Sequence, residues 1–188
     1  MTLAIALLVG FGGTISALTE GRQIAAREYG VWYGWPDAGA EEIDPYLRAD
    51  LARSGNLQLG RAEGVSFHAI VDDQGGELNG RCSYTVSGTV PKSSAWTIRV
   101  APRKQNGYSL NASNGDGSPT SFLVNNEIQF GAKGKFTIDV SPSPKPGNWL
   151  KSPEGAFELT LNVYDSNAFV VVGNETVKLP LVRKGSCS

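Results

Sequence analysis

From Gly60 onward the chain consists largely of short segments in which apolar and polar residues alternate. A period of two is typical of β-strands that bury one face and expose the other. Glycine and proline separate these segments and indicate turns between them. The clearest alternating segments are 65–71, 82–90, 96–100, 136–140 and 157–163. The pattern predicts an all-β fold, namely an antiparallel β-sandwich or jelly-roll-like domain.

The first two of these segments are separated by the acidic, glycine-rich sequence DDQGG. Aspartate and glycine in such a cluster are typical turn formers. We therefore expect segments 65–71 and 82–90 to pair as a β-hairpin with one solvated face.

One segment before Gly60 follows a helical period instead. Asp44 can cap free N–H groups at a helix start, and Pro45 suits the first helical turn because its φ angle is already fixed. The apolar residues of this segment recur every four positions and form one stripe. They are Ile43, Leu47 and Leu51. The sequence predicts a single short helix here.

Alternating residues also precede this helix, at Tyr29, Val31, Tyr33 and Trp35, and predict a further strand. Two interpretations are open. Trp32, Tyr33 and Trp35 can form an exposed aromatic surface that stacks on a sugar ring or a lipid headgroup, or docks a protein partner. Alternatively, the strand buries its aromatic face, which a bare alternation favours.

The first charged side chain is Glu20, so residues 1–19 form an uncharged and largely apolar stretch. A helix of this length spans about 28 Å, close to the hydrocarbon thickness of about 30 Å. We expect residues 1–20 to form a transmembrane anchor or an uncleaved signal, with a cleaved signal peptide as the alternative. A linker with the aromatic strand over 21–43 and a single β-sandwich domain over 44–188 complete the expected organisation.

Charge and cysteine content indicate opposite sides of the membrane. Arg22 and Arg27 follow the apolar stretch, and the positive-inside rule places such residues in the cytoplasm. Cys82 and Cys187 are the only cysteines, and in an exported domain they are a natural disulfide pair. Two unrelated thiols are the alternative.

The overall charge is nearly balanced, with 17 basic and 18 acidic side chains. This balance argues against a nucleic-acid-binding protein, which normally carries a basic excess. Three basic residues are expected on solvated strand faces: Arg99, Lys133 and Lys135. They can form a patch for phosphate headgroups or anionic glycans, or they can be ordinary solvated residues.

The sequence contains no recognisable catalytic motif. His68 is the only histidine and lies within an alternating segment, which favours a structural role. Zinc motifs and glycine-rich phosphate loops are missing from the sequence, so no cofactor is expected. Acidic residues in glycine-rich turns can offer oxygen ligands to calcium, although such residues commonly serve the turn itself. They are Asp72, Asp73, Glu77 and Asp116.

Several motifs together resemble one bacterial protein family. They are WYGWP at 32–36, DPYLRA at 44–49, LGRAEGVSFHA at 59–69, CSY at 82–84 and PGNWL at 146–150, with a cysteine close to the carboxyl end. In this combination the chain resembles the small, membrane-anchored proteins of the domain of unknown function 1214 family. The likeness runs through nearly the whole chain, and the formal domain is expected over roughly 78–185. The family-motif residues are Asp44, Pro45, Tyr46, Arg48, Gly147, Asn148 and Trp149.

The resemblance implies a jelly-roll-like β domain that faces the periplasm and has no agreed catalytic residues. An oxidising periplasm in turn implies that Cys82 and Cys187 form a disulfide. The expected protein is anchored in the bacterial inner membrane by one helix, with its carboxyl-terminal domain in the periplasm. Its expected role is non-catalytic, either binding or structural, with an envelope protein or an anionic ligand as partner. The alternative is a hydrolase that acts on an anionic or glycan substrate through carboxylates, whose separation in space the sequence does not define.

Overall fold

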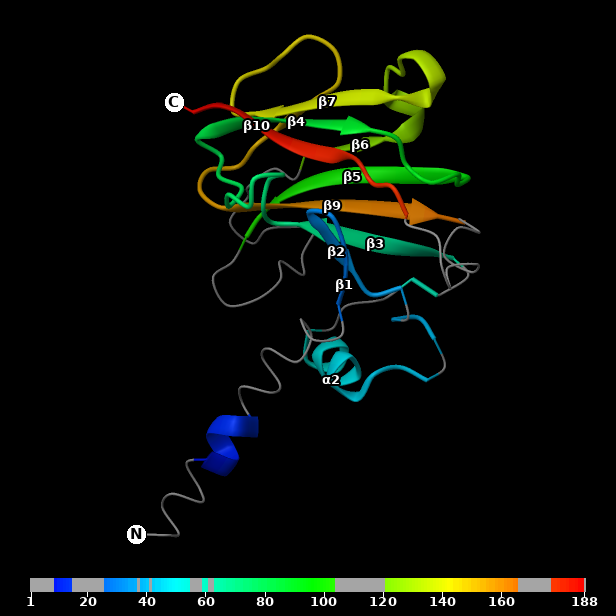
Figure 1. The fold of residues 1–188 in the computed structure, drawn as a ribbon, viewed down its shortest axis with the longest axis vertical. Helices are drawn as coiled ribbons and strands as arrows, with labels where there is room; N and C mark the ends of the chain where they lie inside the picture. The colour runs from blue at the N-terminus through cyan, green and yellow to red at the C-terminus, as the bar shows by residue number, and fades with distance from the viewer. Residues whose placement is uncertain are drawn as a thin grey trace.

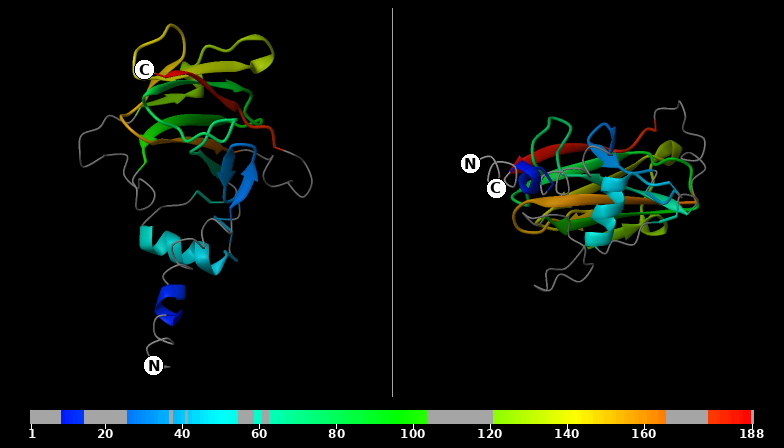
Figure 2. Two further views of the ribbon diagram at one scale, coloured as in Figure 1. Left: turned by 60° about the vertical axis from the view of Figure 1, so that its left-hand side comes forward. Right: turned by 90° about the horizontal axis from the view of Figure 1, so that it is seen from below.

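The computed structural model describes residues 9–14, 26–36, 38–40, 42–54, 59–60, 63–103, 121–165 and 177–187. Within these residues the chain forms two stacked β-sheets and few helical turns (Figure 1 and Figure 2). This architecture confirms the predicted all-β sandwich.

The larger sheet has six strands, and their order across the sheet differs from their order in the chain. Across the sheet they are β1 (Arg27–Tyr29), β2 (Trp32–Gly34), β3 (Gly64–Ala69), β9 (Phe157–Tyr164), β5 (Ala95–Pro102) and β6 (Ser121–Val124). Each strand is antiparallel to its neighbours. The late strand β9 therefore joins two strands that come much earlier in the chain.

The smaller sheet has four strands. Across the sheet they are β10 (Leu181–Cys187), β4 (Cys82–Gly88), β7 (Phe136–Ser141) and β8 (Trp149–Lys151). The pair β7–β8 is parallel, which departs from the predicted antiparallel arrangement. The reason is that the connection 142–148 returns the chain along β7 before β8 runs beside it.

The predicted hairpin on either side of DDQGG is wrong. β3 and β4 belong to different sheets, and β3 pairs with β2 and β9. The turn does form, but it closes only a local bridge between Val71 and Glu77. Within it the Asp72 carboxylate accepts the N–H groups of Gln74 and Gly76, each at 2.9 Å. Alternation shows which face of a strand is buried, and it does not show which strand lies beside it.

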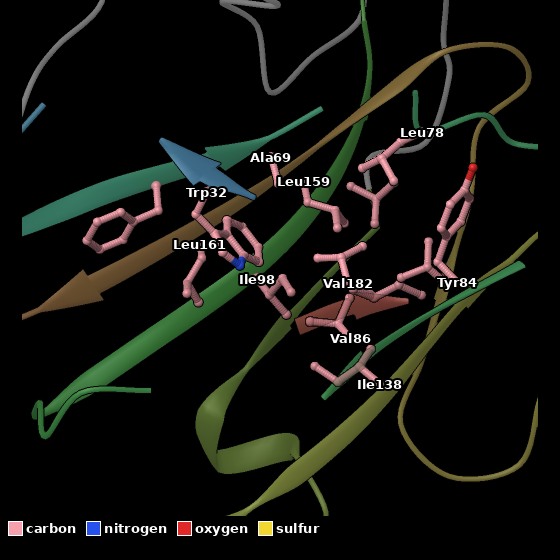
Figure 3. Packing of buried hydrophobic residues seen from close by; sticks show 14 of the residues in the cluster. Trp32, Ala69, Leu78, Tyr84, Val86, Ile98, Ile138, Leu159, Leu161 and Val182 are labelled. Atoms are coloured by element: carbon pink, nitrogen blue, oxygen red, sulfur yellow. The ribbon is translucent and has the colours of Figure 1, made fainter. Parts of the chain in front are cut away.

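The core lies between the two sheets, where the inward side chains of their strands meet. Figure 3 shows Trp32, Ile98 and Leu161 of the larger sheet close to Val86 and Ile138 of the smaller sheet. Each of these side chains is at most 1% exposed. Because successive side chains of a strand point to opposite faces, the residues between the core positions point outward.

The predicted aromatic strand is a hairpin, in which β1 and β2 pair around a turn at Gly30. Gly30 has a φ of +69°, a conformation that favours glycine. Beyond this turn Trp32 enters the core, and its Nε1 donates to the carbonyl of Pro180 at 2.6 Å. Trp32 and Trp35 are only 1% and 6% exposed, and Tyr33 is half-buried. Trp32 and Trp35 therefore do not belong to an exposed aromatic surface. The predicted phase of the strand is also wrong, because Trp32 rather than Tyr33 enters the main core.

The predicted short helix is confirmed as α2 (Pro45–Ser54). Asp44 precedes it, and its carboxylate accepts the N–H of Leu47 at 3.2 Å. Leu47 packs with Trp35 in a small apolar cluster separate from the main core. α2 lies outside the sandwich, on the side of the helical segment 9–14 (Figure 1 and Figure 2).

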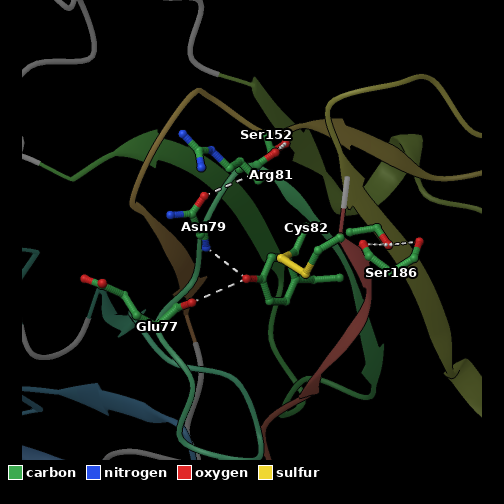
Figure 4. Close-up of a disulfide and its surroundings, with 10 residues drawn as sticks. Glu77, Asn79, Arg81, Cys82, Ser152 and Ser186 are labelled. Atoms are coloured by element: carbon green, nitrogen blue, oxygen red, sulfur yellow. Dashed lines mark hydrogen bonds between the residues drawn. A yellow bond between two sulfur atoms is a disulfide. The ribbon is translucent and has the colours of Figure 1, made fainter.

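Cys82 and Cys187 form a disulfide, which confirms the predicted pairing. The two residues are neighbours in the ladder between β4 and β10, so the bond ties the last strand to the smaller sheet (Figure 4). Beside it, the Ser83 hydroxyl donates to the carbonyl of Ser186 at 3.1 Å.

The predicted transmembrane segment 1–20 is described only over residues 9–14, which are helical. Among the helices of the described residues, none has the length and apolar character that a membrane crossing requires.

A buried tyrosine on β4 links the stability of the fold to alkaline pH. Tyr84 is 1% exposed, and its hydroxyl accepts the N–H of Asn79 at 2.9 Å and donates to the carbonyl of Glu77 at 3.4 Å (Figure 4). Burial raises the pKa of the Tyr84 hydroxyl above its ordinary value of 10.0. Since the folded state then holds this proton more tightly than the unfolded state, the resulting stability is complete below about pH 10 and is lost as the pH rises through the folded-state pKa.

We expect Tyr84→Phe to lower the free energy of unfolding by about 1 kcal/mol at neutral pH, because the N–H of Asn79 loses its partner. The difference between wild type and variant should shrink above about pH 10, where only the wild type loses the contribution of this hydroxyl. Urea unfolding of both proteins from neutral to alkaline pH measures this difference. A difference that grows with pH would contradict the raised pKa.

Candidate functional site

The outer face of the larger sheet carries polar side chains on three adjacent strands. Phe67, Ile98 and Leu161 are fully buried between the sheets. Their neighbours along β3, β5 and β9 therefore point away from the core. Among these outward residues are His68 and Arg99, both of which line a pocket on this face.

The strand register arranges the outward side chains in two rows. In the first row His68 lies opposite Thr160, Thr160 lies opposite Arg99, and Arg99 lies opposite Phe122. The second row consists of Ser66, Asn162 and Thr97. Because adjacent strands are about 4.8 Å apart, side chains within a row lie close enough to contact one ligand together.

The two rows form the floor of a pocket with a volume of about 340 Å³. This volume lies at the lower end of the range of about 300–1,000 Å³ that is typical of small-molecule sites. The side of the pocket comes mainly from the segment after β2. Its lining residues there are Trp35, Pro36, Ala38 and Gly39. The pocket thus combines a polar floor with a largely apolar side wall.

Arg99 supplies the positive charge of this pocket. Among the described lining residues it is the only lysine, arginine, aspartate or glutamate. Its Nε is buried and has no hydrogen-bond partner within the described part of the chain. A buried donor without a partner costs about 1–3 kcal/mol, so such groups call for an explanation. A bound anion can contact the Arg99 side chain only where it lines the pocket.

Among the described residues, three side chains contact His68. Its Nδ1 contacts Oε1 of Glu158 on β9, and the two side chains are only 15% and 13% exposed. The Tyr33 ring stacks on the imidazole with 5.6 Å between ring centroids, and the Trp35 ring meets it edge-on at 5.7 Å. With Nδ1 engaged by the carboxylate, Nε2 is the nitrogen that can contact a ligand.

The second row forms a chain of neutral hydrogen bonds. The Ser66 hydroxyl donates to Oδ1 of Asn162 at 2.7 Å, and Nδ2 of Asn162 donates to the Thr97 hydroxyl at 3.2 Å. Because the Thr97 oxygen accepts in this chain, its own O–H can donate to a ligand. The row therefore offers oriented hydroxyl and amide groups without adding charge.

A family match covers this site. The sequence pattern of the family described as "Protein of unknown function (DUF1214)" matches residues 63–168. The chain belongs to this family. The matched range begins and ends earlier than the roughly 78–185 expected from the sequence, and it contains both polar rows.

Two solved structures are similar to this DUF1214 protein. The VPA0106 protein from Vibrio parahaemolyticus has a TM-score of 0.57 at 18% identity, over 75% of this chain and 35% of that chain. An uncharacterised protein from Burkholderia cenocepacia has a TM-score of 0.41 at 20% identity, over 64% of this chain and 28% of that chain. This chain therefore spans about a third of the length of the Vibrio protein, and the likeness to it concerns the fold alone. No curated protein matches the sequence.

In this DUF1214 protein the three predicted patch residues lie on different elements. Arg99 lies on β5 and lines the pocket. Lys133 and Lys135 are exposed within and directly after the 3-10 helix η2 (Ala132–Gly134), which precedes β7 of the smaller sheet. The prediction that both lysines lie on a strand face is wrong, because β7 begins only at Phe136. Neither lysine lines the pocket with Arg99.

The acidic residues that were weighed as calcium ligands have other partners. The Asp72 carboxylate accepts N–H groups of its own turn. Asp73 and Glu77 each form an ion pair with an arginine, at 3.7 and 2.9 Å. Asp116 lies outside the described residues. Within the residues that the structure describes, no group of histidine, cysteine or acidic side chains is arranged to hold a metal ion.

The DUF1214 motif PGNWL stabilises the connection before β8. Asn148 accepts the N–H of Gln129 at 2.8 Å and donates to the carbonyls of Gln129 and Thr137, both at 2.9 Å. Gly147 has a φ of +86°, which favours glycine, and the Trp149 indole donates to a serine hydroxyl of β7 at 3.0 Å. These contacts give the motif a structural role.

The motif DPYLRA starts α2. Asp44 caps the helix, Pro45 is its first residue, and Arg48 is exposed on its surface. The structure does not describe the side chain of Tyr46. Of the motif side chains that are described, none lines the pocket.

Sequence reasoning singled out Arg99 as a candidate but assigned His68 a structural role, and it missed their neighbours on β9. Glu158, Thr160 and Asn162 occupy alternate positions of this strand and make its outer face wholly polar. That signal is present in the sequence. Its meaning depends on the register, which places β9 between the strands of His68 and Arg99.

Proposed function

We propose that this DUF1214 protein is a non-catalytic binding protein whose pocket takes a small ligand with an anionic group. The observation that carries the proposal is Arg99, which is the only lysine, arginine, aspartate or glutamate among the described residues that line the pocket. A carboxylate or phosphate can accept two N–H groups from one guanidinium, and such charge-assisted hydrogen bonds are stronger than those between neutral groups.

The surroundings of Arg99 favour the anion of a bound ligand over a carboxylate of the protein as its partner. Glu158 lies on the adjacent strand, but its carboxylate contacts His68. Thr160, directly opposite Arg99, adds a neutral hydroxyl.

We also propose that residues 1–20 anchor the protein in the bacterial inner membrane and that the pocket faces the periplasm. The uncharged stretch 1–19 supports an anchor, and the disulfide supports an oxidising compartment. Carbonate extraction of bacterial membranes should leave the full chain in the pellet, and protease added to spheroplasts should digest the β-sandwich. Release by carbonate would overturn the anchor, and protection from protease would overturn the orientation.

The test of binding is isothermal titration of the full chain with acetate, inorganic phosphate, D-glucuronate and glucose 6-phosphate. We expect at least one of these anions to bind the wild type and to bind Arg99→Gln at least about 30-fold more weakly, which corresponds to about 2 kcal/mol. Because the Nε of Arg99 has no described partner, the variant should keep the Tm of the wild type.

The matched control is Lys135→Gln, which removes the same charge outside the pocket. It should bind as the wild type does. Absence of binding to every anion, or equal weakening in both variants, would overturn the proposal.

A second candidate function is a hydrolase that acts on the same anionic substrate. The contact between His68 and Glu158 favours it, because a carboxylate that orients an imidazole is a common arrangement for proton transfer. Product release from chromogenic esters and glycosides of sugar acids by the wild type, and its loss in His68→Gln, would establish this activity.

A further inference from the structure

We infer that the ligand of this pocket is a sugar acid, that is, one hydroxylated ring that carries a single carboxylate. The inference rests on the proposed function, because it assigns the anionic group to Arg99. It goes further by assigning the remainder of the ligand to the second row and to Phe122 at the rim of the pocket.

The charge of the pocket matches one negative charge. Arg99 is the only lysine or arginine among its described lining residues, and the neighbouring Glu158 engages His68. A carboxylate monoanion balances the single guanidinium. A phosphate monoester carries nearly two negative charges at neutral pH and would bring the second one close to Glu158. The pocket therefore favours a carboxylate over a phosphate.

The second row matches a ligand with several hydroxyl groups. Ser66, Asn162 and Thr97 fix one another through hydrogen bonds of 2.7 and 3.2 Å, so their remaining donors and acceptors are oriented in advance. Neutral groups of this kind form hydrogen bonds with a hydroxyl as donor and as acceptor. A simple carboxylate such as acetate would leave this row without a partner.

The rim matches the apolar face of a sugar ring. Phe122 lines the pocket at the end of the first row and is 59% exposed. An exposed phenylalanine at the edge of a pocket offers an apolar ring face that a ligand can contact. The C–H groups of a sugar ring can pack on such aromatic surfaces while its hydroxyls face the floor.

The spacing of the first row matches a single ring. His68 and Arg99 are separated by one strand, so their backbone positions are about 10 Å apart. Hydrogen bonds of about 2.9 Å at both ends leave room between them for one ring. The carboxylate at Arg99 and a ring hydroxyl at Nε2 of His68 would then fix both ends of the molecule.

The experiment is isothermal titration of the full chain with D-glucuronate, D-glucose, acetate and glucose 6-phosphate. For the wild type we expect D-glucuronate to bind at least about tenfold more tightly than each of the other three. Arg99→Gln should bind D-glucuronate no more tightly than D-glucose. Thr97→Val replaces one hydroxyl of the second row by a methyl group. It should weaken the binding of D-glucuronate about fivefold or more and leave the binding of acetate unchanged.

Ser66→Ala is the second variant of this row, and far-ultraviolet circular dichroism checks the fold of each protein. Lys135→Gln is the control outside the pocket, and its affinities for the four ligands should follow the same order as those of the wild type. Acetate binding as tightly as D-glucuronate would overturn the sugar assignment and leave the proposed function intact. Tighter binding of glucose 6-phosphate would overturn the carboxylate assignment. If none of the three anions binds, the proposed function itself is overturned.

Discussion

Replacement of both Cys82 and Cys187 by serine is expected to lower the free energy of unfolding by about 4 to 5 kcal/mol. The disulfide closes a loop with a sequence separation of 105 residues, and in the chain-entropy model a loop of this length restricts the unfolded chain by about that amount. The bond also holds β10, the last strand, at the edge of the smaller sheet. A loss of this size is a large fraction of the stability of a typical domain.

Urea unfolding of the double variant and of the wild type measures the effect. Reduction of the wild type by a thiol should reproduce it, because both treatments remove the same cross-link. Ser83→Ala is the matched control, since it removes the hydrogen bond beside the disulfide and keeps the bond itself; it should cost about 1 kcal/mol or less. A loss below about 1 kcal/mol in the double variant would contradict a role of the disulfide in holding the fold.

The strands and the helix of this protein could be predicted because their signals are local. Alternation in segments such as 157–163 depends only on which face is buried, and Asp44 with Pro45 depends only on the chemistry of a helix start. Strand pairing depends on distant residues. Phe67 on β3 pairs with Leu161 on β9, and no local pattern identifies that partner. The hairpin expected around DDQGG was wrong for this reason.

The same distinction between local signals and long-range pairing applies to the site. The sequence marks His68 as the only histidine and Arg99 as a basic residue on a solvated strand face. It does not show that Thr160 separates them or that Glu158 contacts the imidazole, because both facts require β9 between β3 and β5. Residues of a sheet face can thus be recognised from a sequence, whereas the site that they form depends on the register.

Replacement of Trp32 by alanine is expected to lower the free energy of unfolding by about 3 to 5 kcal/mol, the usual range for a large aromatic side chain in a core. Trp32 is 1% exposed, belongs to the main core, and donates its indole N–H to the carbonyl of Pro180 at 2.6 Å. The substitution would leave a cavity between the sheets and a carbonyl without its donor. Urea unfolding of the wild type and the variant measures the loss.

Two further variants separate the contributions at this position. Trp32→Phe keeps a smaller ring in the core but cannot donate to Pro180. Its free energy of unfolding should therefore lie between those of the wild type and the alanine variant. Phe122→Ala is the control for an exposed aromatic side chain, at 59% exposure, and should change the free energy of unfolding by about 0.5 kcal/mol or less. Equal losses for Trp32→Ala and Phe122→Ala would mean that Trp32 is exposed in solution. In that case the aromatic segment, rather than the pocket at Arg99, would become the first surface to test for a binding partner.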